Sequence, residues 1–225
     1  MKNFGVVIAD DYEYNPYVES VKKYGSKETK RRNKESVEFV LGDKKIICVK
    51  CGIGKVNAAS ATAFLISDDN CEIIFNIGLS GAVSGHRRDD IVAGESFREC
   101  DFDLTAINVP LGVKPQEKFV YEPDKKLFDL ALSIPGVGKA VCGTGDLFLA
   151  DKKRAEFYRE TFGITTFDME TAAIASVCND AGVKFLSLRQ ISDDADDVAG
   201  ADYTESNNKQ QKTLSDTLLQ IIEKL

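Results

Sequence analysis

The sequence predicts an α/β fold, a single three-layer α/β/α domain around a mixed, largely parallel central sheet. Short apolar runs alternate with segments of helical spacing along the whole chain, a pattern typical of βαβ units. Residues 37–41 and 45–50 flank Gly42-Asp43, a hairpin signal, so the sheet should be mixed. The chain shows no internal repeat, low-complexity segment or linker, so residues 1–225 are expected to form one domain.

The expected strands are short and mostly apolar. The first, Gly5 to Ala9, is a continuous apolar run of the kind that is buried in parallel sheets. Further strands are expected at residues 37–41, 45–50, 72–77, 90–97, 139–142 and 184–191. The strand at 72–77 is followed by Gly78-Leu79-Ser80-Gly81, which predicts a turn.

The expected helices lie between these strands. Apolar residues recur with helical spacing at 16–24, 56–66, 124–132, 152–161, 169–180 and 205–225. The helix at 56–66 follows a glycine-rich turn, and Gly182 follows the helix at 169–180 as a C-terminal cap. Strands and helices therefore alternate nearly to the end of the chain.

Composition excludes several classes of protein. The chain has 225 residues, is 43% hydrophobic and carries a net charge of −7, so it can bury a sizeable core but repels phosphate backbones. No nucleic-acid partner is expected. No apolar stretch approaches the roughly 20 residues needed to cross a bilayer, and the first residues lack a signal peptide's apolar segment. The expectation is a cytoplasmic protein with no membrane partner.

The cysteines predict neither a metal site nor a disulfide. The chain has six Cys and one His, and only Cys48 and Cys51 are close in sequence. They fall in an extended pattern, where residues three apart point to opposite faces, so the two thiols should not converge. Reduced, buried thiols are expected, with no metal and no cofactor.

Two glycine-rich segments invite comparison with phosphate-binding loops. The segment Cys51-Gly52-Ile53-Gly54-Lys55-Val56 resembles part of one, but its spacing puts Val49 and Val56 where Gly and Ser/Thr are required. The segment at 78–81 does not match the dinucleotide-binding pattern. Two interpretations remain open for each: a sharp turn at a strand end, or a close approach of backbone to a ligand.

Carboxylates follow the strand-like runs, where open α/β sheets build ligand sites. Glu13 follows the first strand, and Glu170 is expected in the first turn of a helix. Asp193 opens a segment that also contains Asp194 and Asp196. Crowded like charges favour keeping one acid protonated, and such an acid can donate a proton. The alternative is a solvated loop with ordinary helix-capping residues.

An ordered set of motifs resembles the nucleoside phosphorylase and nucleosidase superfamily nearly end to end. The motifs are Gly5-Val6-Val7-Ile8-Ala9 with Glu13, Gly52-Ile53-Gly54-Lys55-Val56-Asn57-Ala58-Ala59, Asn76-Ile77-Gly78-Leu79-Ser80-Gly81, Asp90-Ile91-Val92, Asp101-Phe102-Asp103-Leu104-Thr105, Gly145-Asp146-Leu147-Phe148, Asp168-Met169-Glu170-Thr171-Ala172-Ala173 and Ile191-Ser192-Asp193. The methylthioadenosine/S-adenosylhomocysteine nucleosidase branch is the most similar.

The resemblance implies a hydrolase that releases a purine base from such a nucleoside. Asp193 would protonate N7 of the base, with Ser192 orienting that acid. Phe148 would stack on the base and Leu149 would present backbone groups to it. Protonation of the leaving group suits an oxocarbenium-like transition state, as in sugar hydrolysis.

The resemblance also implies roles around the sugar and the 5′ group. Glu13 would activate the attacking water, with Arg189 as a second contact, and Glu170 would bind the ribose hydroxyls above Met169. Tyr203 matches an aromatic position near the 5′ substituent, and Leu79 occupies a substrate-binding position where the branch usually has serine. The segment Ile107 to Pro110 resembles one that completes the neighbouring subunit's pocket, which implies a homodimer.

Two alternatives to hydrolysis remain. Phosphorolysis on the same fold needs cationic phosphate ligands, and Asn76 occupies a position where related phosphorylases use arginine. Arg87 and Arg88 could supply a nonstandard phosphate site. The second alternative is a noncatalytic nucleoside-binding protein, against which the joint presence of Glu13, Glu170 and Asp193 argues. The chain also departs from the branch at Glu99-Cys100, where an aromatic residue and a histidine are usual.

Overall fold

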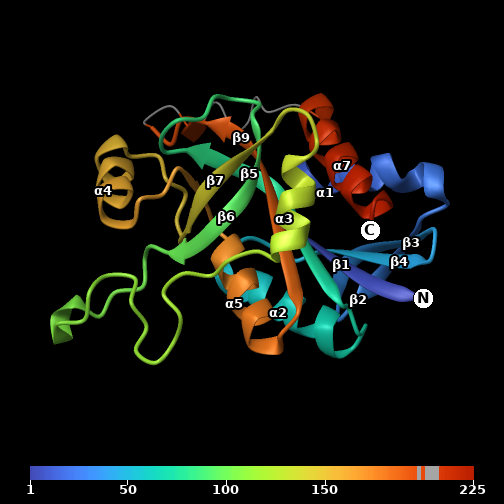
Figure 1. Ribbon diagram of the computed structural model, residues 1–225, viewed down its shortest axis with the longest axis horizontal. Helices are drawn as coiled ribbons and strands as arrows, with labels where there is room; N and C mark the ends of the chain where they lie inside the picture. The colour runs from blue at the N-terminus through green and yellow to red at the C-terminus, as the bar shows by residue number, and fades with distance from the viewer. Residues whose placement is uncertain (197–198, 201–207) are drawn as a thin grey trace.

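A central β-sheet organises the protein in the computed structural model, which describes residues 1–196, 199–200 and 208–225. Across these residues, nine strands form one sheet (Figure 1). They are β1 (Lys2–Ile8), β2 (Lys27–Arg31), β3 (Lys34–Leu41), β4 (Lys44–Lys50), β5 (Ile73–Ala82), β6 (Ile91–Glu99), β7 (Val137–Thr144), β8 (Thr166–Asp168) and β9 (Lys184–Asp193).

Helices cover both faces of the sheet. They are α1 (Asp11–Val21), α2 (Lys55–Ser67), α3 (Lys125–Leu132), α4 (Lys152–Phe162), α5 (Thr171–Ala181) and α7 (Asn208–Glu223), with short 3₁₀ turns η1 (Lys22–Tyr24) and η2 (Thr105–Ile107). One apolar core joins α1, α3 and α7 to one face, and a second joins α2 and α5 to the other (Figure 1). The predicted three-layer α/β/α class is therefore confirmed.

The sheet is mixed, as predicted, but it also closes on itself. Strand β1 lies parallel between β4 and β5, and β5 is parallel to β9. The predicted hairpin is present as the antiparallel pair β3–β4. Strand β5 pairs with both β8 and β9, while β6 pairs with both β7 and β9. Local sequence patterns did not predict this closure. The parallel pairing of β1, β5 and β9 brings their carboxyl ends to one edge.

The turn predicted at residues 78–81 was wrong, because β5 continues through it to Ala82. Neither Gly78 nor Gly81 has a positive φ, so backbone freedom is not why glycine occurs there. A Cβ on Gly78 would lie 2.5 Å from Glu13 Oε1, and one on Gly81 would lie 2.7 Å from Asp193 Oδ1. These glycines leave room for two carboxylates. By contrast, Gly52 and Gly54 have φ of 89° and 95° and form a true turn.

Two element boundaries differ from prediction in ways that bear on function. Helix α1 begins at Asp11 rather than Pro16, because Asp10 caps it by accepting a hydrogen bond from the Glu13 amide. Pro16 therefore lies inside the helix. Helix α5 begins after Glu170, which is its N-cap residue rather than a member of the first turn. The predicted C-terminal cap, Gly182, is confirmed in the left-handed region with φ of 65°.

The remaining predictions concern the cysteines and membrane spans. Cys48 packs in the core on one sheet face and Cys51 in the core on the other, which confirms that they do not converge. All six cysteines are free and buried. Among the described residues, no helix has the length and apolar character required to cross a membrane.

Candidate active site

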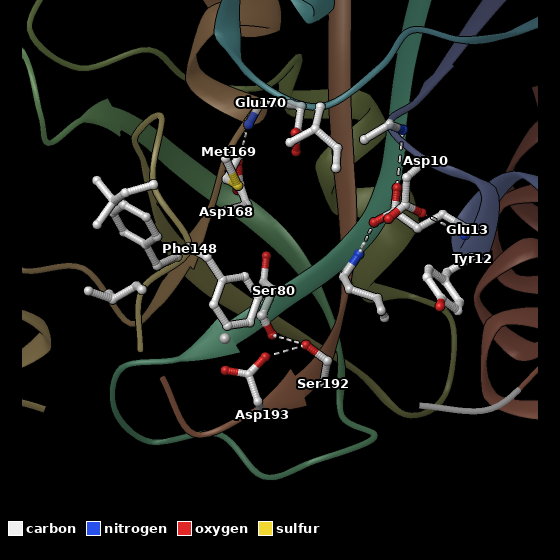
Figure 2. A pocket seen from close by; sticks show the side chains of 17 residues that line it. Asp10, Tyr12, Glu13, Ser80, Phe148, Asp168, Met169, Glu170, Ser192 and Asp193 are labelled. Atoms are coloured by element: carbon white, nitrogen blue, oxygen red, sulfur yellow. Dashed lines mark hydrogen bonds between the residues drawn. The ribbon is translucent and has the colours of Figure 1, made fainter. Parts of the chain in front are cut away.

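A pocket of about 260 Å³ opens where β1, β5 and β9 end (Figure 2). The structure brings eight of the ten predicted site residues to its walls: Glu13, Leu79, Phe148, Leu149, Met169, Glu170, Ser192 and Asp193. Arg189 lies beneath the wall, and Tyr203 falls outside the described residues. Residues far apart in the sequence thus converge at the predicted sheet edge.

Glu13 is buried and held by two backbone amides. Its Oε2 accepts from Ala9 N at 3.1 Å and its Oε1 accepts from Leu79 N at 2.7 Å, which ties the end of β1 to β5. Burial and the nearby Asp10 and Glu170 carboxylates raise the pKa of Glu13 to about 8, while Arg189 and the Leu79 amide oppose that shift. The carboxyl is therefore rigidly placed and close to changing charge at neutral pH.

Arg189 is the largest fully buried side chain among the described residues and anchors the floor of the pocket. Its guanidinium donates to Asn76 Oδ1 at 2.7 Å, to the Leu79 carbonyl at 3.3 Å and to Thr171 Oγ1. It also lies 3.4 Å from Asp168 Oδ1 and 3.8 Å from Glu170 Oε2. A buried cation thus compensates a group of buried acids, although it does not line the pocket.

Glu170 faces the pocket from the start of α5 and is held by the turn before α2. Its Oε1 accepts from Gly54 N at 3.0 Å. Burial and Asp168 raise the pKa of Glu170 to about 7, against the lowering effect of Arg189 and two backbone amides. Gly54 has a left-handed φ, so the turn that presents this amide requires glycine.

Asp168 fixes the backbone beneath Glu170. Its Oδ1 accepts from Glu170 N at 2.8 Å, from Thr171 N at 2.7 Å and from Thr144 Oγ1 at 3.1 Å. It thereby satisfies amides at the start of α5 and joins that helix to β7. The sequence showed this residue in a motif, but nothing in its neighbours distinguished it from an ordinary strand-end aspartate.

Asp193 lies at the end of β9, where a register shift against β5 places it opposite Gly81. Its Oδ2 accepts from Ser192 Oγ at 2.6 Å (Figure 2). Its Oδ1 accepts from Ala195 N at 2.9 Å. The Ser192 contact agrees with the orienting role expected for that residue. Both contacts come from within two residues of Asp193.

Phe148, Leu149 and Met169 belong to the apolar part of the wall. The Phe148 side chain is 47% exposed, whereas Leu149 is buried. The loop that carries them is tied to the rest of the site, because Asp146 N donates to Asp101 Oδ2 and Asp146 Oδ1 accepts from Lys55 N. An exposed aromatic ring beside an acid suits a flat, uncharged base.

Among the other residues that line the pocket, sequence reasoning assigned no role to Asp10, Tyr12, Ile53, Ser80 and Asp168. Asp10 and Tyr12 lie beside Glu13 in the sequence, so the helix start at Asp11 was the signal that could have placed them. Ser80 was hidden by the erroneous turn at 78–81. Its buried Oγ is one of the side-chain oxygens without a hydrogen-bond partner among the described residues.

The charge of the pocket is one-sided. Among the described lining residues there are five acids and no lysine or arginine. Asn76, at the position that phosphorylases fill with arginine, donates to the Val7 carbonyl and accepts from Arg189. Arg87 and Arg88 lie in the segment after β5 and do not line the pocket. Nothing in this described wall resembles a binding site for a phosphate dianion.

Comparison with known proteins agrees with this architecture. Residues 3–225 match the family model of the Phosphorylase superfamily, so the chain belongs to that family. A 5′-methylthioadenosine/S-adenosylhomocysteine nucleosidase of Exiguobacterium sp. is 34% identical over 186 residues, which cover 79% of this chain and 80% of that protein.

Two solved structures of Helicobacter pylori proteins superpose over the whole chain. A mutant 5′-methylthioadenosine/S-adenosylhomocysteine nucleosidase with 5′-methylthioadenosine in its active site gives a TM-score of 0.94 at 27% identity, covering 100% of both chains. A futalosine hydrolase gives 0.94 at 26% identity, covering 100% of this chain and 98% of that one. The two names specify different nucleosides, and both structures share the fold of this chain.

Proposed function

We propose that the protein is a purine nucleosidase that hydrolyses the N-glycosidic bond of 5′-methylthioadenosine, S-adenosylhomocysteine or a related nucleoside. The observation that carries the proposal is the set of three pocket acids, Glu13, Glu170 and Asp193, in a described wall without a basic side chain. Cleavage of this bond develops positive charge on the sugar, which fixed carboxylates stabilise. The curated relative and the superposed structures support the same chemistry.

At the base end, Asp193 donates a proton to N7 of the purine as the glycosidic bond breaks. The leaving group then departs as a neutral base instead of an anion. Ser192 holds the Asp193 carboxyl at 2.6 Å, and Phe148 and Leu149 contact the base. A proton transfer of this kind typically contributes ~10²–10⁴ in rate.

At the sugar end, Glu13 holds a water molecule and takes a proton from it as the oxygen attacks the anomeric carbon. The cationic sugar lies next to Glu13 and favours its ionised form, which offsets the effect of burial on its pKa. Glu170 accepts hydrogen bonds from the ribose hydroxyls, and Met169 packs beneath the ring. Arg189 positions this end through Leu79 and Glu170 rather than by touching water.

The proposal favours water over phosphate as the nucleophile. The Arg189 guanidinium donates to Asn76, Thr171 and the Leu79 carbonyl, and the described residues that line the pocket include no lysine or arginine. A phosphate dianion would face Asp10, Glu13 and Glu170 without a partner. The joint presence of Glu13, Glu170 and Asp193 argues against a noncatalytic binding protein.

A nucleoside panel tests the proposal. Methylthioadenosine, S-adenosylhomocysteine, adenosine, inosine and uridine are incubated with the protein, each with and without phosphate, and free base is measured. We expect purine release from at least one 5′-thio nucleoside at a rate independent of phosphate. Strict dependence on phosphate, or release of no base from any member, would contradict the proposal.

We propose in addition that the protein is a homodimer whose segment 107–110 reaches the neighbour's pocket. The loop that bears this segment, drawn in green, projects from the rest of the molecule (Figure 1), and its Ile107 side chain is 66% exposed. Val56, beside the pocket at the start of α2, is 81% exposed. Such apolar residues at a projecting loop and a pocket rim suit a subunit interface.

Light scattering tests the dimer directly. We expect twice the monomer mass, and Ile107→Asp should lower both the mass and the turnover of methylthioadenosine. A monomer with full activity would rule out a shared pocket. The free, buried state of all six cysteines supports a cytoplasmic location, which cell fractionation checks.

A further inference from the structure

One corner of the pocket has no role in the proposed reaction. Asp193 and Phe148 face the base, and Glu13 and Glu170 face the water and the sugar. Asp10 and Tyr12 lie together beside Glu13, away from Asp193 and Phe148 (Figure 2). If the proposed function holds, the one part of a nucleoside left to occupy this corner is its 5′ substituent.

Asp10 is fixed in this corner by the start of α1. Its backbone is extended, with φ of −132°, and its Oδ1 accepts from Glu13 N at 3.1 Å. The carboxylate therefore caps the helix and lies next to the acid that is assigned to the water.

The negative charge of Asp10 affects the pKa of Glu13 inside the pocket. After burial itself, Asp10 is the largest influence that raises the pKa of Glu13, ahead of the nearby Glu170, whereas Arg189 lowers it. The neighbouring Asp11 differs, because it does not line the pocket and its carboxylate pairs with Lys50 Nζ at 2.6 Å. Lys50 also pairs with Glu35 at 2.9 Å.

We propose that Asp10 is a specificity-determining residue that selects the charge of the 5′ substituent. It favours nucleosides whose 5′ group bears an ammonium over those whose 5′ group bears a carboxylate. Tyr12, Ile53 and Leu79 also line the pocket and accept the apolar part of that group. The acid set of the described wall makes an anionic 5′ group costly to bind, since it would be desolvated beside like charge.

The test measures binding with nucleosides that cannot react. Three 7-deazaadenosine derivatives lack the N7 that the proposed mechanism protonates, and they carry a 5′-ammonium, a 5′-methyl or a 5′-carboxylate group. Calorimetry gives Kd for each with the wild type, Asp10→Asn and Asp11→Asn. Asparagine is as good an N-cap as aspartate, so Asp10→Asn removes charge while keeping the helix start.

The wild type should bind the ammonium derivative more tightly than the carboxylate derivative. Asp10→Asn should shrink that ratio by roughly tenfold, as expected for a charge a few ångströms away near a protein surface. Asp11→Asn should leave the ratio unchanged. A ratio that Asp10→Asn does not alter, or that both variants alter equally, would show that Asp10 serves only as a helix cap.

A kinetic measurement adds a second readout. Removal of the Asp10 charge lowers the pKa of Glu13, so the acid limb of the kcat/KM profile for methylthioadenosine should move to lower pH in Asp10→Asn. An unmoved limb would contradict the placement of Asp10 beside the reacting water. If no nucleoside is hydrolysed but the binding ratio changes as expected, the nucleosidase proposal is wrong. The proposal that Asp10 selects the charge of the 5′ substituent is then still supported.

Discussion

The two ends of the pocket are built in different ways. At the sugar end, Glu13, Glu170 and Arg189 are held by amides, carbonyls and side chains from β1, β5, α5 and the turn before α2. At the base end, Asp193 is held by Ser192 and Ala195, its own neighbours in the chain. The sugar end is therefore held by bonds from distant elements. The bonds described for Asp193 come from its chain neighbours, and Ser192 in turn donates to the Ser80 carbonyl of β5 at 3.4 Å.

This difference matches the chemistry expected at each end. Charge develops on the sugar, and groups that stabilise it act best when they are fixed before the reaction begins. The base end has to admit a flat ring and release it, and Phe148 there remains 47% exposed. Three predictions test how far the two ends differ.

The largest effect is expected from removing the acids one at a time. Asp193→Asn and Glu13→Gln should each lower kcat for methylthioadenosine by ~10²–10⁴. Their effects on stability should differ. In Asp193→Asn, the new side-chain amide can still accept from Ala195 N and turn its NH₂ group toward Ser192 Oγ. In Glu13→Gln, the NH₂ group must point at the backbone N–H of either Ala9 or Leu79.

The free energy of unfolding should therefore fall by about 1–3 kcal/mol in Glu13→Gln, as for a buried polar group left without a partner. Asp193→Asn should remain close to the wild type. Chemical denaturation measures both variants. Equal losses of stability would mean that the base end is as deeply integrated in the fold as the sugar end.

The same contrast explains what the sequence could predict. The fold class followed from alternating apolar runs and helical spacings, which are local. The pair Ser192–Asp193 is adjacent in sequence, so its contact could be anticipated. The contact between Arg189 and Asn76 could not be anticipated, because the two residues are 113 positions apart and meet only when β5 and β9 pair.

Three segments were misjudged from the sequence for reasons that differ. Strand β2 has the sequence Lys-Glu-Thr-Lys-Arg, which lacks an apolar pattern and is defined by its pairing with β3. Pro16 suggested a helix start, but the cap at Asp10 placed the start five residues earlier. Gly78 and Gly81 suggested a turn, although their role is to leave room for side chains from other elements. Only the glycine error concerned distant partners, whereas the other two concerned a pairing or a cap between neighbouring residues that carries no apolar pattern.

A second prediction compares those two glycines. A Cβ on Gly78 would lie 2.5 Å from Glu13 Oε1 and still closer to Arg189 Nη1, and both side chains are held by several bonds. A Cβ on Gly81 would lie 2.7 Å from Asp193 Oδ1 and 3.1 Å from Ala195 Cβ. Gly78→Ala should lower the free energy of unfolding by about 1–3 kcal/mol, as overpacking does, and should also lower activity.

Gly81→Ala should lower activity with a smaller loss of stability, because Asp193 can rotate within its local surroundings. Gly138→Ala in β7 is the matched control, since its Cβ would meet nothing nearer than Val92 Cγ1 at 3.6 Å. Denaturation and methylthioadenosine turnover are measured for all three variants. If Gly78→Ala is as stable as Gly138→Ala, the sugar end is not rigid.

The third prediction concerns the pH dependence of stability. The pKa of Glu13 rises from an ordinary 4.5 to about 8 in the folded protein, chiefly because the group is buried. Between these values the folded state keeps a proton that the unfolded state releases, so the Glu13 contribution makes stability fall as pH rises from about 5 to about 8. Above that range the contribution is constant.

Glu13→Gln should remove this dependence. The free energy of unfolding of the variant, relative to the wild type, should therefore increase as pH rises through that window, on top of the constant loss from its mismatched amide. Glu19→Gln, at an exposed residue of α1 that pairs with Lys22, should run parallel to the wild type. A Glu13→Gln curve that is also parallel to the wild type would show that Glu13 is ionised in the unliganded protein. The sugar end would then carry its full negative charge before any nucleoside arrives.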